Sequence, residues 1–391
     1  WSLYQVDVET ARGLDDGAIR DFTDNLVDIV AATDGDIAAA AAEYGLVDEL
    51  LDRTEIRELL IDYVGPDEDY PDTYKSAYMQ EYLAQMRVLA GSKAGSKNVA
   101  VIVAAGDILF GSQPPGTIGG DSTAALLRRA RNDDSVEAVV LRVDSPGGSA
   151  FASEVITDEI LALQEDGIPV VASMGSVAAS GGYLIAMNAD RVFASPSTIT
   201  GSIGIFGMFP TYQRTMSAVG IATDGIGSTP WTGEFRPDRE MSDHAKQLFQ
   251  LVINDGYQDF IGSVAESRGM DIDAVDAIGQ GRVWTGMDAL NNGLIDELGG
   301  LDDAIAAAAE LAEISDDDFG IKTIEQELSP TEQMIVDLLG AVSVLGVDVS
   351  GWGGTHSFVD NVASSILDNA APLLRFNDPQ GVYAHCLCEI R

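Results

Sequence analysis

The sequence is poor in cysteine and histidine, and this shortage excludes whole classes of site. Its 391 residues include two cysteines, Cys386 and Cys388, and three histidines. The cysteines are separated by a single residue on a segment taken to be an extended strand, and we expect no disulfide between them. Zinc would need more cysteine and histidine ligands at suitable spacing than this chain offers. We therefore expect no metal and no cofactor.

Positive charge is also scarce. Lysine and arginine together number 22, only five of them lysines, against 63 aspartates and glutamates, which gives a formal net charge of -41. Polyphosphate chains and anionic lipid surfaces repel such a chain. Nucleic acid is therefore excluded as a partner.

Long apolar runs are missing as well. The longest, residues 334–349, is interrupted by Asp337 and Asp348 and is too short to span a bilayer. The chain opens on Trp1, without the charged segment and apolar core of a signal peptide, and we expect it to be a fragment of a longer protein. An apolar content of 46% is still enough for one large core and a second, smaller unit.

A six-residue motif occurs twice. Residues 45–50 read Gly-Leu-Val-Asp-Glu-Leu and residues 293–298 read Gly-Leu-Ile-Asp-Glu-Leu, 248 positions further on, each between an alanine-rich helical run and another helix. We interpret the pair as a tandem repeat whose first copy is truncated. The predicted parts are the closing helices of the first copy (1–64), a linker (65–97), a complete second copy (98–320) and a C-terminal extension (321–391).

Apolar strands alternate with amphipathic helices through the second copy. The pattern predicts strands at 98–108, 138–143, 169–173 and 191–194, and helices at 123–132, 152–164 and 181–188. This order is typical of parallel βαβ units. The predicted fold class is therefore α/β with a parallel core.

Two strand-to-helix junctions carry the candidate chemistry. At 144–149 the sequence Asp-Ser-Pro-Gly-Gly-Ser follows a strand, and its paired glycines let the backbone turn and expose amide hydrogens. At 175–183 the sequence Gly-Ser-Val-Ala-Ala-Ser-Gly-Gly-Tyr follows the next strand and places Ser180, a candidate nucleophile, where a helix begins. Either motif alone is more often a turn or a helix cap. Together they would meet at the sheet edge where α/β proteins form their ligand sites.

These segments, together with Pro-Ser-Thr-Ile-Thr-Gly-Ser-Ile-Gly at 196–204 and Phe-Asn-Asp-Pro-Gln at 376–380, resemble the signal peptide peptidase family, SppA or protease IV, in its long tandem-repeat bacterial form. The resemblance implies a ClpP/crotonase-like spiral of βα units. It implies a serine endopeptidase with a Ser/Lys dyad that degrades cleaved signal peptides and other short apolar peptides through an acyl-enzyme. It also implies a homo-oligomer on the periplasmic side of the bacterial inner membrane, held by an anchor outside this chain.

The resemblance also assigns roles to single residues. Ser180 matches the nucleophile, Gly147 or Gly148 with Gly181 match the oxyanion-hole donors, and Ser202 is a candidate for orienting the lysine. Short members of the family carry that lysine in a loop which here, at 227–232, contains none. We expect the general base in the first copy, in a loop upstream of this chain.

Other bases fit less well. Lys75 follows the repeated motif, whereas the required loop should precede it. The three histidines, His244, His356 and His385, are predicted to fall outside the core βα units, so we expect no Ser/His/Asp triad.

Two other functions remain open. A crotonase-like CoA-ester enzyme would share the fold and use similar backbone amides, but it would need acidic catalysts in place of Ser180. A non-catalytic scaffold that binds peptides would not need the Ser180 hydroxyl at all.

Overall fold

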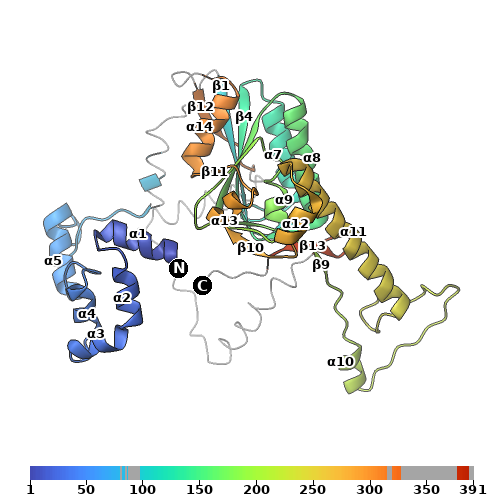
Figure 1. Cartoon of the computed structure of the whole chain (residues 1–391), viewed down its shortest axis with the longest axis horizontal. Coiled ribbons are helices and arrows are strands. Elements are labelled where there is room, and N and C mark those ends of the chain that lie inside the picture. The colour runs from blue at the N-terminus through green and yellow to red at the C-terminus, as the bar shows by residue number, and fades with distance from the viewer. Residues whose placement is uncertain (80–81, 84–85, 87–96, 315–318, 327–376, 387–391) are drawn as a thin grey trace. The chain divides into compact units, whose positions relative to one another are not determined.

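The computed structural model describes the chain except residues 80–81, 84–85, 87–96, 315–318, 327–376 and 387–391 (Figure 1). The chain forms two compact units, Trp1–Ser92 and Lys93–Arg391, and each is described by itself. The apolar run at 334–349 and Phe376 lie outside the described residues. Within the described part, no helix has both the length and the apolar character needed to cross a membrane.

The first unit is helical. Its helices are α1 (Ser2–Arg12), α2 (Ala18–Asp24), α3 (Leu26–Ala32), α4 (Ile37–Glu43) and α5 (Arg53–Val64). Aspartates cap two of them: Asp36 accepts from an amide in the first turn of α4, and Asp52 forms a capping box with Glu55 at the start of α5.

Both copies of the repeated motif end a helix in the same way. Gly45 follows α4 and Gly293 follows α13 (Gly286–Asn291), and both have a left-handed backbone, with φ of 69° and 78°. In each copy the next amide, of Leu46 or Leu294, donates to an alanine carbonyl five residues back, at 2.9 and 2.8 Å. This shared turn supports the tandem repeat, which stays a prediction.

The second unit is built on an eight-stranded, mostly parallel sheet. Its order is β10-β8-β6-β4-β1-β12, with β7 beside β6 and β11 beside β7; only β10 is antiparallel to its neighbour. The strands are β1 (Lys97–Ala105), β4 (Val136–Ser145), β6 (Val170–Ala179), β7 (Arg191–Ala194), β8 (Ile199–Gly201), β10 (Val283–Thr285), β11 (Glu297–Leu298) and β12 (Phe319–Thr323). The strand β12 crosses the predicted boundary at 320 between the second copy and the C-terminal extension.

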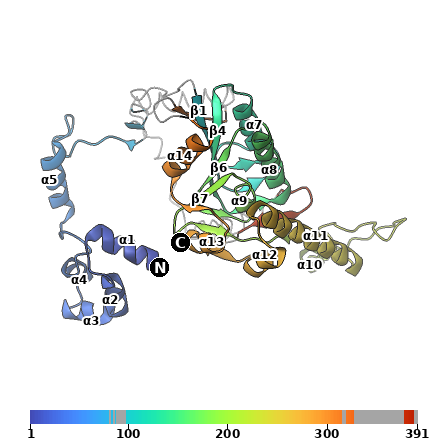
Figure 2. The same ribbon diagram turned by 45° about the horizontal axis from the view of Figure 1, so that its top comes forward.

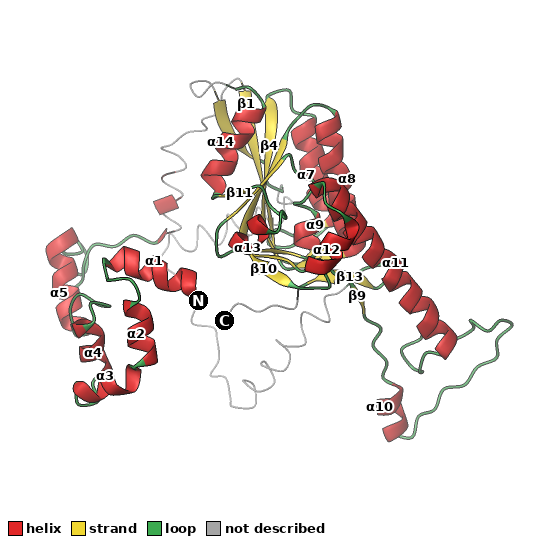
Figure 3. Cartoon of the chain, in the orientation of Figure 1, coloured by secondary structure: helices red, strands yellow, loops and turns green. Residues whose placement is uncertain are grey.

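Helices cover both faces of this sheet. Along β1, Val99 and Val101 pack under α14 (Leu301–Leu311), whereas Ala100 and Ile102 face the opposite side. That side is covered by helices that include α7 (Gly120–Arg131), α8 (Ala150–Glu165), α9 (Gly181–Leu184) and α11 (Asp243–Arg268), as Figures 2 and 3 show. Burial on both faces explains why the strands are almost continuously apolar. The remaining helices are α10 (Gln213–Ala218) and α12 (Ile272–Ile278).

The predicted alternation of strands and helices from 98 to 194 is confirmed. The strand predicted at 191–194 matches β7 from end to end. The helix predicted at 181–188 is shorter, because α9 ends at Leu184. There the Ala186 amide donates to Tyr183 O only three residues back, which tightens the turn beyond α-helical geometry.

A second sheet lies at the carboxyl ends of β4 and β6. Its order is β3-β2-β5-β13-β9, made of β2 (Ile108–Leu109), β3 (Ile118–Gly119), β5 (Gly147–Ser149), β9 (Phe206–Gly207) and β13 (Val382–His385). The C-terminal strand β13 runs antiparallel to both β5 and β9. The sequence pattern did not predict this strand.

Replacing Leu141 of β4 by alanine tests the packing of the main sheet. Its side chain is fully buried, so Leu141→Ala should lower the free energy of unfolding by about 2–5 kcal/mol, through lost burial and the cavity left behind. Val103 of β1 is 54% exposed and provides the control, because Val103→Ala should cost less than about 1 kcal/mol. Urea unfolding followed by circular dichroism measures both, and equal costs would contradict the assignment of Leu141 to the core.

Candidate active site

Ser180 lies between β6 and α9 in a strained backbone conformation. Its φ is 56° and its ψ is -116°, a region that costs a non-glycine residue about 1–3 kcal/mol and persists only where the surroundings impose it. The Ser180 amide donates to Gly201 O at 2.8 Å, and its carbonyl accepts from Leu184 N at 2.9 Å. Its hydroxyl donates to Gly204 O at 3.4 Å. A serine on a strained strand-to-helix turn is typical of catalytic nucleophiles.

The junction at 144–149 is fixed by a buried serine. Ser145 is fully buried, its hydroxyl donates to Gly106 O at 2.7 Å, and it accepts from the Gly147 amide at 3.1 Å. The Gly147 amide is therefore already bonded within its own loop. Of the two glycines predicted as donors here, Gly148 is the better candidate.

Glycines bring the two junctions within contact distance. A Cβ on Gly147 would lie 2.6 Å from Gly181 N, and a Cβ on Gly181 would lie 3.2 Å from Gly148 N. A Cβ on Gly182 would lie 2.5 Å from Ser145 O. A Cβ on Gly181 would also lie 2.9 Å from the backbone atom Ala384 O. Real Cβ atoms essentially never lie within 3.0 Å of backbone atoms, so these three positions require glycine. The structure thus brings Gly147, Gly148 and Gly181 together beside Ser180.

Ser202 lies next to the residue that holds the Ser180 amide. It follows Gly201 directly, has a left-handed φ of 51°, and its amide donates to Arg282 O at 2.7 Å. Two residues earlier, Thr200 donates from its hydroxyl to Ala178 O at 2.6 Å, which ties this loop to the end of β6. Ser202 therefore lies in the neighbourhood that the sequence motif predicted.

The lysines that the structure describes are each paired with a carboxylate. Three of these pairs are Lys75 with Glu68 at 3.2 Å, Lys97 with Glu137 at 3.5 Å and Lys246 with Glu240 at 3.2 Å. The fourth pair joins Lys322 to Asp133. Hydrogen bonds from Lys322 and from Ser135 lower the pKa of Asp133 to about 2. Lys93 lies outside the described residues. Each of these four amines therefore has a carboxylate as its partner in the structure.

His385 lies in the C-terminal tail, outside the core βα units, but next to the junction at 144–149. It belongs to β13, is paired with Gly147 in the strand register, and has its Nε2 atom 3.3 Å from Asp107 Oδ1. The sequence pattern did not indicate this position, because a segment more than 200 residues away in sequence joins the sheet beside the glycines.

The expectation that the cysteines form no disulfide was wrong. Cys386 is disulfide-bonded, and the sequence holds only one other cysteine, Cys388, outside the described residues. The argument against a bond assumed an extended strand, but β13 ends at His385, before the first cysteine. The Cys386 amide donates to Pro146 O at 2.6 Å, so this end of the chain is fixed to the junction at 144–149.

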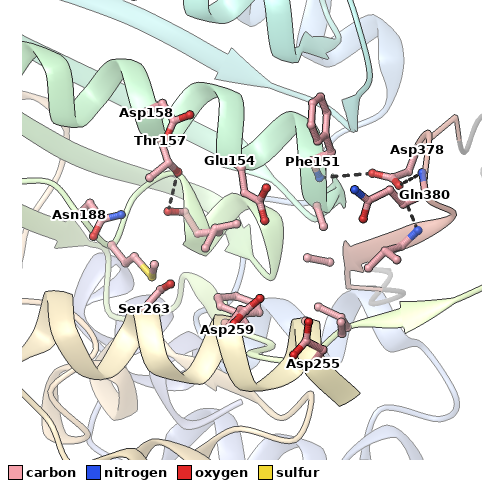
Figure 4. Close-up of a pocket in the computed structure, with 18 of the residues that line it drawn as sticks. Phe151, Glu154, Thr157, Asp158, Asn188, Asp255, Asp259, Ser263, Asp378 and Gln380 are labelled. Atoms are coloured by element: carbon pink, nitrogen blue, oxygen red, sulfur yellow. Dashed lines mark hydrogen bonds between the residues drawn. The ribbon is translucent and has the colours of Figure 1, made fainter. Parts of the chain in front are cut away.

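A pocket of about 560 Å³ opens between α8, α11 and β13 (Figure 4). Leu184, Met187 and Ile205 contribute apolar lining, while acidic residues line it from the two helices, Glu154 among them. Burial, together with the charges of Asp158, Asp259 and Asp378, raises the pKa of Glu154. Among the described residues, no lysine, arginine or histidine lines the pocket, and no three metal-binding side chains group in a way that could hold an ion.

The close approach of Gly148 can be tested by adding one methyl group. In Gly148→Ala the new Cβ would lie 1.9 Å from Ile108 O, a backbone atom that cannot turn aside. We expect labelling of Ser180 by a fluorophosphonate to slow by about 100-fold, because the amide of residue 148 would be displaced. Gly262→Ala is the matched control, since nothing lies within 4 Å of its Cβ. Equal labelling rates in the two variants would contradict a role for Gly148.

Comparison with known proteins agrees with this geometry. Residues 162–315 match the family model described as Peptidase family S49. The chain is 36% identical to Protease 4 of Salmonella typhi and 34% identical to Protease 4 of Haemophilus influenzae, over 99% of its own length in both cases. It spans 61% and 62% of the length of these two relatives.

A Synechocystis sp. protein named as a protease is 35% identical to this chain, and the match covers 62% of the chain and 86% of that protein. A solved structure of a membrane-bound stomatin-specific protease mutant with a substrate peptide covers 62% of this chain at 17% identity and a TM-score of 0.39, too low to support an argument. The sequence relatives, the matched family model and the parallel βα sheet show that the chain belongs to peptidase family S49 and has the ClpP/crotonase-like α/β fold.

Proposed function

We propose that the protein is a serine endopeptidase that cleaves short apolar peptides through an acyl-enzyme on Ser180. One observation carries the proposal: a buried serine, held in a strained backbone, lies where the amides of Gly148 and Gly181 converge. The identity to proteases of family S49 over nearly the whole chain supports the same chemistry.

The proposed reaction proceeds in two steps. The Ser180 hydroxyl loses its proton to a base and attacks the peptide carbonyl carbon, so that the carbonyl oxygen becomes an oxyanion. The amides of Gly148 and Gly181 donate hydrogen bonds to it, each worth about 3 kcal/mol of transition-state stabilisation. The base then protonates the leaving amine, the C–N bond breaks, and the ester on Ser180 is hydrolysed by water.

The base is proposed to be a lysine from the first copy of the repeat, outside this chain. Burial near Ser180 would favour the neutral amine, which is the form that accepts a proton. Ser202 is proposed to orient that amine, and its position next to Gly201, which accepts from the Ser180 amide, supports this role.

The biological setting is proposed from the relatives. Protease 4 of two bacteria and a protein of Enterococcus faecium named as a signal peptide peptidase SppA match this chain. We therefore propose peptides left by signal-peptide cleavage as substrates, a homo-oligomer as the working form, and anchoring at the bacterial inner membrane, on its periplasmic side, through a segment outside this chain.

Removing one oxygen tests the nucleophile. In the full-length protein, which includes the proposed lysine, Ser180→Ala should abolish labelling by a fluorophosphonate and lower hydrolysis of a fluorogenic apolar peptide by roughly 10³-fold or more, with thermal stability unchanged. Ser217, an exposed serine at the end of α10, provides the control, and Ser217→Ala should keep both activities. Full hydrolysis by the Ser180→Ala protein would contradict the assignment of Ser180 as the nucleophile. The remaining roles for this site would be ones that do not need the hydroxyl, such as that of a scaffold.

The placement of the base predicts the effect of removing Lys75. Lys75→Ala should keep peptide hydrolysis within about twofold, because this amine is exposed and paired with Glu68. The measurement is kcat/KM across pH 6–10 for the wild type and the variant. A loss of about 10³-fold at every pH would instead identify Lys75 as the general base.

A further inference from the structure

The C-terminal strand lies where an extended peptide would meet the site. Residues Val382–His385 form β13, which is antiparallel to β5 on one side and to β9 on the other. The strand β5 begins at Gly147, so β13 runs directly along the glycines that converge on Ser180. Adding a strand to a sheet edge is a common way for proteins to bind extended peptides.

The carbonyl of Ala384 points into the converging glycines. Ala384 is paired with Gly148 in the strand register. A Cβ on Gly147 would lie 2.2 Å from Ala384 O, and a Cβ on Gly181 would lie 2.9 Å from the same atom. The carbonyl oxygen of Ala384 thus lies against the backbones of Gly147 and Gly181, and Gly181 directly follows Ser180.

Alternate side chains of the strand face the pocket. Val382 and Ala384 both line it, and they are 6% and 1% exposed. Because side chains two residues apart share a face of a strand, the pocket lies under one face of β13. Space of about 560 Å³ remains beside these small side chains.

A single carboxylate fastens the strand to the site. Asp378 is buried, and its Oδ2 atom accepts from the Ser149 hydroxyl at 2.5 Å. The same atom accepts from the Phe151 amide at 3.3 Å (Figure 4). Its Oδ1 atom accepts from the amides of Gln380 at 2.8 Å and Val382 at 3.1 Å. One oxygen therefore binds the wall of the site and the other binds the turn that leads into β13.

We propose that the space between β5 and β9 is the peptide-binding groove and that residues 382–385 are its resting occupant. Ala384 takes the place of the substrate residue before the cleaved bond, and Val382 that of the residue two positions earlier. The proposal rests on the proposed peptidase function. An extended peptide with a small residue before the bond must displace β13 before it can reach Ser180.

Peptide binding tests this directly without hydrolysis. The probe is a fluorescein-labelled heptapeptide with the sequence of residues 378–384, titrated by fluorescence anisotropy into the full protein carrying Ser180→Ala. Adding Ala384→Asp to that protein places a carboxylate in a buried position beside an acidic pocket, which should release the strand. We expect the Kd of the probe to fall about tenfold or more. Pro379→Ala, at an exposed position of the same turn, should leave the Kd unchanged.

Two further measurements distinguish the outcomes. Asp378→Asn adds no new charge and weakens the same attachment, so it should lower the Kd in the same direction even if the Ala384→Asp protein does not fold. A Kd that is the same with and without these changes, or no binding in any variant, would overturn the groove proposal. Failure of the proposed function would instead appear as no hydrolysis and no fluorophosphonate labelling by the protein with Ser180 intact, which the binding measurement does not involve.

Discussion

The site depends on a single backbone constraint, the left-handed conformation of Ser180. A non-glycine residue adopts it only where neighbouring contacts outweigh a cost of about 1–3 kcal/mol. Here β8 supplies the acceptor for the Ser180 amide, and the first turn of α9 supplies the donor to its carbonyl. The strand β6 and helix α9 are both buried against the core, so the strain is maintained by the same packing that stabilises the domain.

The second junction explains why small residues crowd this region. The hydroxyl of the buried Ser145 accepts a hydrogen bond from the Gly147 amide and donates one to Gly106 O. The Gly147 amide is therefore already bonded, and Gly148 is left facing Gly181. Each close approach requires a residue without Cβ. The motifs Pro-Gly-Gly in one junction and Ser-Gly-Gly in the other thus have one structural cause. The backbones of the two junctions must come within van der Waals contact.

Much of this could be predicted from the sequence, because the information is local. Apolar strands alternating with helices gave the order of elements through β7, and the two motifs gave the residues that converge at the sheet edge. The contribution of β13 could not be predicted, because it depends on pairing between Tyr383 and Ser149 across more than 200 residues. For the same reason, neither the position of His385 beside Asp107 nor the role of Asp378 as acceptor for Ser149 could be predicted. Pairing at such distance is set by the tertiary fold and leaves no periodicity in the chain.

The charge of the chain also bears on where a base can lie. With 63 acidic residues against 22 basic ones, an exposed lysine meets a carboxylate almost anywhere on this surface, as Lys97 and Lys246 do. The Ser180 amide and hydroxyl, by contrast, donate to the neutral carbonyls of Gly201 and Gly204. Burial beside neutral groups disfavours the charged form of an amine. The interior next to Ser180 is therefore the place where a lysine can act as a base.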